Sequence, residues 1–164
     1  MAKRSSGRKR AAATGAELLP ALSTLTELPS FSELAPSQRQ LSAYGAAAAS
    51  DSALELGCVV RLDRGYPAVL TADALFRAEF ATALTKSAFS RVAVGDWVCA
   101  RRPAGHDMGL IEQILPRESD IARWKGGARG ERQTLAANVG TVIVVSALGA
   151  GALDAARIDR KSVV

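Results

Sequence analysis

Five short runs of apolar and β-branched residues, separated by turn residues, occupy the middle of the chain. They lie at intervals of about ten residues and are bounded by glycine, proline or aspartate, which is typical of short strands joined by turns. The predicted strands are residues 58–62, 66–72, 75–81, 96–100 and 109–115. In the third run the side chains alternate, so that Phe76, Ala78 and Phe80 share one face. Five short strands within roughly sixty residues predict a mainly β protein built around a small closed barrel.

The number of strands fits an OB-fold, which is a small five-stranded barrel. An SH3-like barrel and one half of a β-sandwich have similar size and composition. Strand count alone does not choose among the three, so all of them stay open on the pattern alone.

The chain before the barrel has a different composition. Residues 1–10 carry five basic and no acidic side chains, which predicts a disordered arm or, alternatively, an arm that touches phosphates. Residues 11–50 are rich in alanine, serine, leucine and glutamate and are interrupted by prolines. We expect short helices at residues 15–22 and 37–49, the second with Leu41 and Tyr44 on one face that packs against the barrel.

A basic, glycine-rich stretch follows the fifth predicted strand. Pro116 ends that strand, because proline cannot continue a β-ladder. Arginine presents a planar fork that matches phosphate, and glycine lets the backbone approach a polyanion. Trp124 lies within the stretch and is suited either to stacking on a base or to a position between two domains. The alternative is a solvated linker whose arginines form weak ion pairs with Glu118, Asp120 and Glu131.

Eight basic residues of the barrel turns and of this stretch are the predicted RNA contacts. They are Arg64, Arg101, Arg102, Arg117, Arg123, Lys125, Arg129 and Arg132.

Charge and composition narrow the function only slightly. The net charge of +5 and the pI near 9.7 permit a polyanionic partner, but residues 56–139 are only mildly basic, with twelve basic and nine acidic side chains. Cys58 and Cys99 lack metal-ligand spacing and are expected to be small buried apolar residues, while His106 is expected at the surface. No apolar run is long enough to span a membrane, and no secretory signal follows the basic start. We therefore expect a cytoplasmic monomer without membrane contact.

An ordered set of short motifs resembles the N-terminal part of the RsgA family, the ribosome small-subunit-dependent GTPases. The resemblance covers about residues 55–150. Its motifs are GxV at Gly57 and Val59, VGDWV at 94–98, LPRxSxxxR from Leu115 to Arg123, QxxAAN at 133–138, and an apolar run at 141–145.

The resemblance implies an OB-fold domain that docks on the small (30S) ribosomal subunit and its rRNA, during late maturation of that subunit. In such a family this domain precedes a circularly permuted GTPase domain and a zinc-binding domain, so GTP, Mg²⁺ and Zn²⁺ are implied for a full-length member. We accordingly expect a flexible basic arm and Ala-rich extension over residues 1–50 and the OB-fold over 51–125. Residues 126–164 would form the junction and the start, including the first strand, of an incomplete α/β GTPase domain.

The chain also departs from the pattern of the family. Gly140 stands where an aspartate is usual, and the 164 residues contain no GxxxxGK[ST], NKxD or DxxG motif and no zinc-ligand set. We therefore expect a truncated or frame-shifted member with no catalytic residue and no cofactor of its own. Its function is then that of the ribosome-binding part of a GTPase or, alternatively, of a non-enzymatic OB-fold module that binds RNA. A small barrel that binds protein is a third hypothesis.

Overall fold

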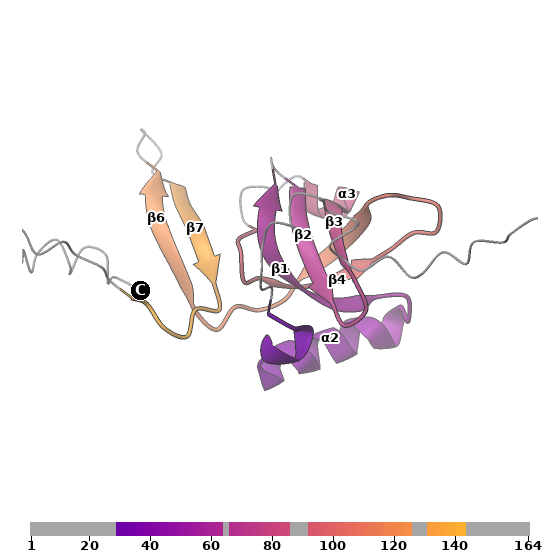
Figure 1. The fold of residues 1–164 in the computed structure, drawn as a ribbon, viewed down its shortest axis with the longest axis horizontal. Helices are drawn as coiled ribbons and strands as arrows, with labels where there is room; N and C mark the ends of the chain where they lie inside the picture. The colour runs from indigo at the N-terminus through magenta and orange to yellow at the C-terminus, as the bar shows by residue number, and fades with distance from the viewer. Residues whose placement is uncertain (1–28, 64–65, 86–91, 126–130, 144–164) are drawn as a thin grey trace, which may run out of the picture.

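The computed structural model describes residues 29–63, 66–85, 92–125 and 131–143 (Figure 1). Strands β1 (Glu55–Asp63), β2 (Tyr66–Thr71), β3 (Leu75–Phe80), β4 (Trp97–Arg101) and β5 (Gly109–Ile114) form a closed barrel. Their positions agree with the five predicted strands to within three residues at each end. The prediction of a small five-stranded barrel is confirmed.

Strand order distinguishes the architectures that strand count left open. The order around the barrel is β1-β2-β3-β5-β4, and β4 closes the barrel by pairing antiparallel with β1. The pairing of β3 with β5 is parallel, and the short helix α3 (Thr82–Thr85) follows β3. This is the order of an OB-fold, so the SH3-like and half-sandwich alternatives are wrong.

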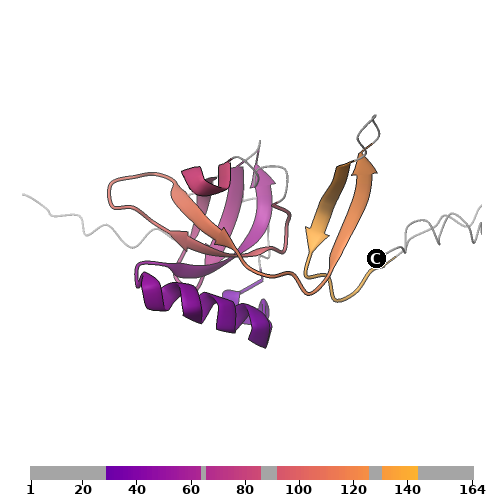
Figure 2. The same ribbon diagram turned by 180° about the vertical axis from the view of Figure 1, so that it is seen from behind.

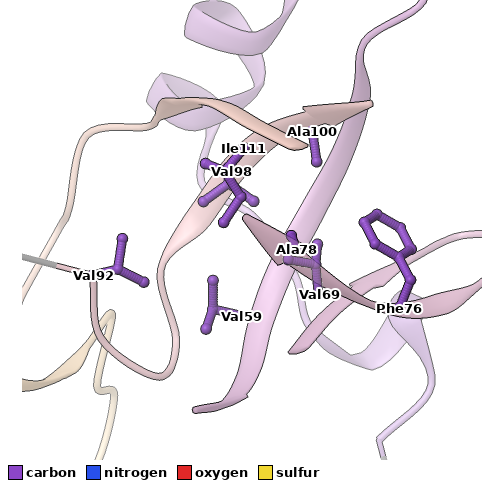
Figure 3. Packing of buried hydrophobic residues seen from close by; sticks show 8 residues of the cluster. All are labelled: Val59, Val69, Phe76, Ala78, Val92, Val98, Ala100 and Ile111. Atoms are coloured by element: carbon purple, nitrogen blue, oxygen red, sulfur yellow. The ribbon is translucent and has the colours of Figure 1, made fainter. Parts of the chain in front are cut away.

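The barrel is filled by one cluster of apolar side chains, most of which are small or β-branched (Figure 3). Phe76 and Ala78 lie in this cluster and Phe80 packs against it, which confirms the alternation predicted for the third strand. Aliphatic side chains without polar atoms suit a closed interior of this size, because they fill it without unsatisfied hydrogen-bonding groups. The cluster contains Val59, Val69, Phe76, Ala78, Val92, Val98, Ala100 and Ile111.

A helix packs on the outside of the barrel, where β1 pairs with β4 (Figures 1 and 2). Helix α2 (Gln38–Ser50) confirms the helix predicted at 37–49, and it follows the 3-10 turn η2 (Phe31–Glu33). Ser37 caps α2 by accepting a hydrogen bond from the Gln40 N–H, in a capping box. As predicted, α2 packs against the barrel, and Tyr44 and Phe31 lie in a cluster with Trp97.

The predicted apolar face of α2 needs one correction. Tyr44 faces the barrel, whereas Leu41 is 39% exposed. The buried face is instead formed by Gln40, Ala43, Tyr44 and Ala47, at the spacing of one side of a helix. A polar residue thus takes the innermost position, because its amide finds hydrogen-bond partners there.

The stretch predicted as a basic loop contains two strands. Strands β6 (Asp120–Lys125) and β7 (Glu131–Ala137) pair antiparallel into a hairpin that stands beside the barrel (Figures 1 and 2). Its glycines at 126, 127 and 130 and Arg129 lie outside the described residues. These strands were not predicted from the sequence, because charged residues and flanking glycines are also common in linkers.

The remaining predictions are tested only in part. Residues 141–143, which begin the predicted apolar strand, have no regular secondary structure, and the rest of that strand lies outside the described residues. The predicted helix at 15–22 also lies outside them. The domain boundaries stay predictions, with β6 and β7 on opposite sides of the one proposed at residue 125. None of the described helices is long and apolar enough to cross a membrane.

Candidate nucleic-acid interface

A buried ion pair joins the barrel to the segment that leads into the hairpin. Asp96 precedes β4 and is fully buried, and it accepts hydrogen bonds from Arg117 Nε at 2.6 Å and Nη2 at 2.7 Å. The Ala93 N–H donates to the same carboxylate at 2.8 Å. Arg117 Nη1 donates onward to Thr134 Oγ1 of β7 at 2.9 Å. Two motif residues far apart in sequence therefore form one structural contact.

An amide cluster completes this junction. Asn138 has a positive φ of 54°, its Nδ2 donates to the Gly95 carbonyl at 2.7 Å, and its Oδ1 accepts from the Glu118 N–H at 2.9 Å. Gln40 Nε2, reaching from α2, donates to Asn138 Oδ1 at 3.0 Å and to the Pro116 carbonyl at 2.9 Å. The asparagine of the AAN motif thus ties the hairpin to both the barrel and α2.

Gly95 is required where the hairpin meets the barrel. Its φ is 90°, and a Cβ at this position would lie 2.1 Å from the Ala137 carbonyl oxygen. The Ala137 N–H donates to the Val94 carbonyl at 2.8 Å, so the backbones of the two segments are in direct contact. The glycine is used here both for its conformation and for the close approach.

The motifs therefore have a structural role that sequence reasoning missed. Asp96, Gln40 and Asn138 were not predicted as site residues, although VGDWV and QxxAAN were recognised as ordered motifs. The signal was the presence of an aspartate after Gly95 and of an asparagine in short motifs, because the side chains of these two residue types commonly bond to nearby backbone. Arg117, which was predicted to contact RNA, is engaged by Asp96 and Thr134.

A cavity of about 420 Å³ lies beside the amide cluster. Its walls include Trp97, Gln40 and Asn138 together with the carboxylates of Glu33 and Glu118. None of the residues lining this cavity is cationic. It is therefore poorly suited to a phosphate.

The hairpin exposes a tryptophan between basic residues. Trp124 is 72% exposed, and the exposed Arg123 precedes it in β6. Across the hairpin, Trp124 is paired with Arg132, whose side chain is 53% exposed. Arg132 Nη1 and Nη2 donate to the two Asp120 carboxylate oxygens at 2.8 and 2.7 Å. Lys125 follows Trp124 in the same strand.

The predicted contacts on the barrel are held in ion pairs. Arg101 pairs with Asp51 and Glu112, while Arg102 donates Nε and Nη2 to Glu55 at 2.9 and 3.0 Å. These pairs are partly exposed and are therefore weak enough to exchange partners. Arg64 and Arg129 lie outside the described residues.

The titratable groups show how the junction and the barrel are stabilised. The hydrogen bonds that Arg117 donates to Asp96 raise the pKa of Arg117, and the hydrogen bonds that Arg132 donates to Asp120 lower the pKa of Asp120. Burial raises the pKa of Cys58 to about 12 and that of Cys99 to about 11. Both cysteines are free and buried, as predicted, and a thiol with a raised pKa is a poor nucleophile.

His106 is exposed, which confirms its predicted place at the surface.

The residues present do not fit the groups that the resemblance implies for a full-length protein. The 164 residues contain no phosphate-cradling GxxxxGK[ST] motif for GTP and Mg²⁺. Within the described part of the chain, no group of three or more His, Cys, Asp or Glu side chains is placed to hold a metal ion such as Zn²⁺.

Fold and site together define an OB-fold protein that carries a basic hairpin with an exposed tryptophan. Comparison with curated proteins then relates this chain to two that are both named small ribosomal subunit biogenesis GTPase RsgA. It is 41% identical over 104 residues to the Streptomyces coelicolor protein, covering 63% of this chain and 28% of the relative. It is 39% identical over 104 residues to the Streptomyces avermitilis protein, covering 63% of this chain and 27% of the relative.

These relatives confirm the resemblance to RsgA, and the matching region is their N-terminal part. The chain spans less than a third of the length of these relatives. No family model matches it. Among solved structures, it is similar to YloQ, a circularly permuted GTPase, at 18% identity and a TM-score of 0.36, and to YjeQ from Thermotoga maritima at 20% identity and a TM-score of 0.36. Each match covers 42% of this chain and 24% of the solved chain.

Proposed function

We propose that this chain is the ribosome-docking part of a GTPase that acts in biogenesis of the small ribosomal subunit, and that it binds rRNA through the β6–β7 hairpin. The relatives named RsgA support the ribosomal role. The observation that carries the mode of binding is the exposed basic hairpin beside the barrel, where Arg123, Trp124 and Arg132 lie together. We expect the chain to act as a cytoplasmic monomer with the subunit as its partner.

The hairpin is favoured over the barrel as the main phosphate contact. Arg123 has no carboxylate partner among the described residues, and its Nε donates to Gln133 instead. By contrast, Arg101 and Arg102 on the barrel, and Arg132 on the hairpin, would have to give up carboxylate partners before they contact phosphate. Arg117 is assigned a structural role in this proposal, and the other predicted contacts stay predictions.

Salt dependence of binding tests this assignment. If Arg123, Lys125 and Arg129 contact phosphates, the logarithm of the affinity for purified small subunits should fall with the logarithm of the salt concentration, with a slope of about −2 to −3. The Arg123→Gln/Lys125→Gln variant should flatten that slope by about 1 to 2. Sedimentation with subunits at several salt concentrations gives both numbers.

Two further variants serve as comparisons. Arg39→Gln removes one exposed cation from α2 and should leave the slope unchanged. Removal of residues 1–10 should weaken binding less than the hairpin variant, unless the arm supplies the non-specific part of the affinity. Absence of subunit binding at low salt refutes the proposed function, and an unchanged slope in the folded hairpin variant refutes the role of the hairpin.

Binding of nucleotide is not expected from these 164 residues alone. Since the sequence lacks the phosphate cradle and the guanine-reading motif, a fluorescent GTP analogue should show no saturable binding, with or without subunits. Micromolar, saturable binding that unlabelled GTP displaces would contradict this expectation.

A further inference from the structure

Trp124 is in an environment unlike that of the other tryptophan. The chain has two tryptophans, of which Trp97 is 4% exposed in the cluster beneath α2 and Trp124 is 72% exposed on the hairpin. A single exposed apolar residue is ordinary. An exposed indole next to cations is less common, and aromatic and basic side chains together form the sites that bind single-stranded nucleic acids.

The register of the hairpin identifies the described neighbours of the exposed Trp124. Trp124 is directly opposite Arg132, and directly opposed residues of antiparallel strands project on the same face. The next pair on the same face of the hairpin is Ala122 and Thr134, whose side chains are small. On this face the described neighbours of Trp124 are therefore Arg132 and two small residues, which agrees with the 72% exposure of the indole.

Arg132 is held in a defined orientation beside the indole. Its two terminal nitrogens donate to Asp120, and Thr134 Oγ1 donates to the same carboxylate at 2.8 Å. Arg117 Nη1 in turn donates to Thr134, so this face of the hairpin is connected to the buried Asp96 pair. Trp124 thus projects from a hairpin that the junction fixes relative to the barrel.

We propose that Trp124 stacks on one unpaired RNA base while the neighbouring cations contact the flanking phosphates. The inference rests on the proposed function and deepens it by specifying single-stranded rather than duplex RNA. Bases inside an A-form duplex are stacked on one another, and its major groove is too narrow for side chains, so an indole reaches a base only in a loop, bulge or free end. Stacking tolerates any base, since every base has a π-face.

Intrinsic fluorescence of the full chain gives a direct test. The exposed Trp124 should be quenched by titration with a short single-stranded oligoadenylate, while the buried Trp97 supplies the unquenched remainder. A duplex RNA of equal length should cause much less quenching. Trp124→Ala should weaken single-strand binding about 5- to 150-fold, and Trp124→Phe should restore most of the affinity.

Separate readouts distinguish stacking from charge. Trp124→Ala should leave the salt slope unchanged, because stacking releases no counterions. Leu135→Ala removes another exposed apolar side chain of the same hairpin, 46% exposed, and should not affect binding. Circular dichroism and the emission of Trp97 would verify that each variant is folded.

Three results would overturn the inference while leaving the proposed function intact. They are wild-type affinity of Trp124→Ala for the oligonucleotide, equal quenching by duplex RNA, and an equal loss of affinity in Leu135→Ala. If Trp124→Ala binds oligonucleotide normally but no longer binds subunits, the tryptophan docks on ribosomal protein and the inference is also wrong. Failure of every variant and of the wild type to bind subunits would instead refute the proposed function.

Discussion

Replacing Arg117 by methionine should destabilise the protein far more than replacing an exposed arginine. The substitution keeps a long apolar side chain but removes the guanidinium from Asp96, which is 0% exposed. Among the described residues, no other cation lies within ion-pair distance of this carboxylate. The carboxylate would then be left buried with its charge uncompensated, which is the costly way to break a buried pair.

The size of the expected loss in unfolding free energy follows from the hydrogen bonds and the burial of the pair. Arg117 donates two hydrogen bonds, at 2.6 and 2.7 Å, to a carboxylate that also accepts one from the Ala93 N–H. Removing one partner of such a buried pair costs about 3–5 kcal/mol in unfolding free energy. That is a large part of the roughly 5–15 kcal/mol that stabilises a typical domain. The raised pKa of Arg117 agrees with a stabilising ion pair, because Asp96 favours the charged form of the guanidinium.

Equilibrium urea unfolding of a double-mutant cycle measures this cost. The losses in Arg117→Met and Asp96→Asn should sum to about 1–3 kcal/mol more than the loss in the double variant, because the pair acts as a unit. As a control, Arg102→Met breaks an exposed pair with Glu55 and a contact to Phe76, and it should cost no more than about 2 kcal/mol. Equal losses in the Arg117 and Arg102 variants, or strict additivity in the cycle, would refute the reasoning.

Three further predictions concern the junction, its acid sensitivity and the thiols. Gly95→Ala should cost at least about 2 kcal/mol in unfolding free energy, because the new Cβ meets Ala137, whereas Gly105→Ala, with a φ of 80° and open space around it, should cost less. Because the pKa of Asp120 is lowered in the folded state, its ionised carboxylate stabilises the fold above the ordinary pKa of 3.8, and this stability is lost as the pH falls through the lower, folded-state pKa. The urea midpoint of Asp120→Asn should therefore decrease less than that of the wild type between about pH 5 and pH 2. With pKa values raised to about 12 and about 11, the two buried thiols should react with a disulfide reagent at pH 8 only slowly in the folded chain and rapidly in urea. Rapid reaction in the native state would contradict the burial.

The barrel and α2 were predictable because their information is local. Strand positions follow from β-branched runs between turn residues, and the start of α2 follows from the proline and serine before it. The ordered motifs also identified the resemblance to RsgA from residues alone. Strand order was not predictable in this way, because the parallel pairing of β3 with β5 joins segments separated by the residues of α3 and β4.

The roles of the arginines depended on tertiary structure. In sequence, Arg117 and Arg123 look alike, six residues apart in one basic stretch. Folding places Arg117 against a buried carboxylate 21 positions earlier in the chain and leaves Arg123 exposed. Nothing in the local pattern distinguishes the two, because an ion pair is decided by which charges the fold brings within reach.

The sequence by itself therefore determined the class of the fold, the position of its core and the basic character of the stretch that follows the barrel. These properties depend on periodicity, turn residues and composition, which are local. Tertiary structure alone decided that this stretch is a hairpin, that Asp96, Gln40 and Asn138 fasten it to the barrel, and that Trp124 faces outward. The physical reason is that burial and partnership are properties of contacts between distant segments, and these form only when the barrel closes and the hairpin docks beside it.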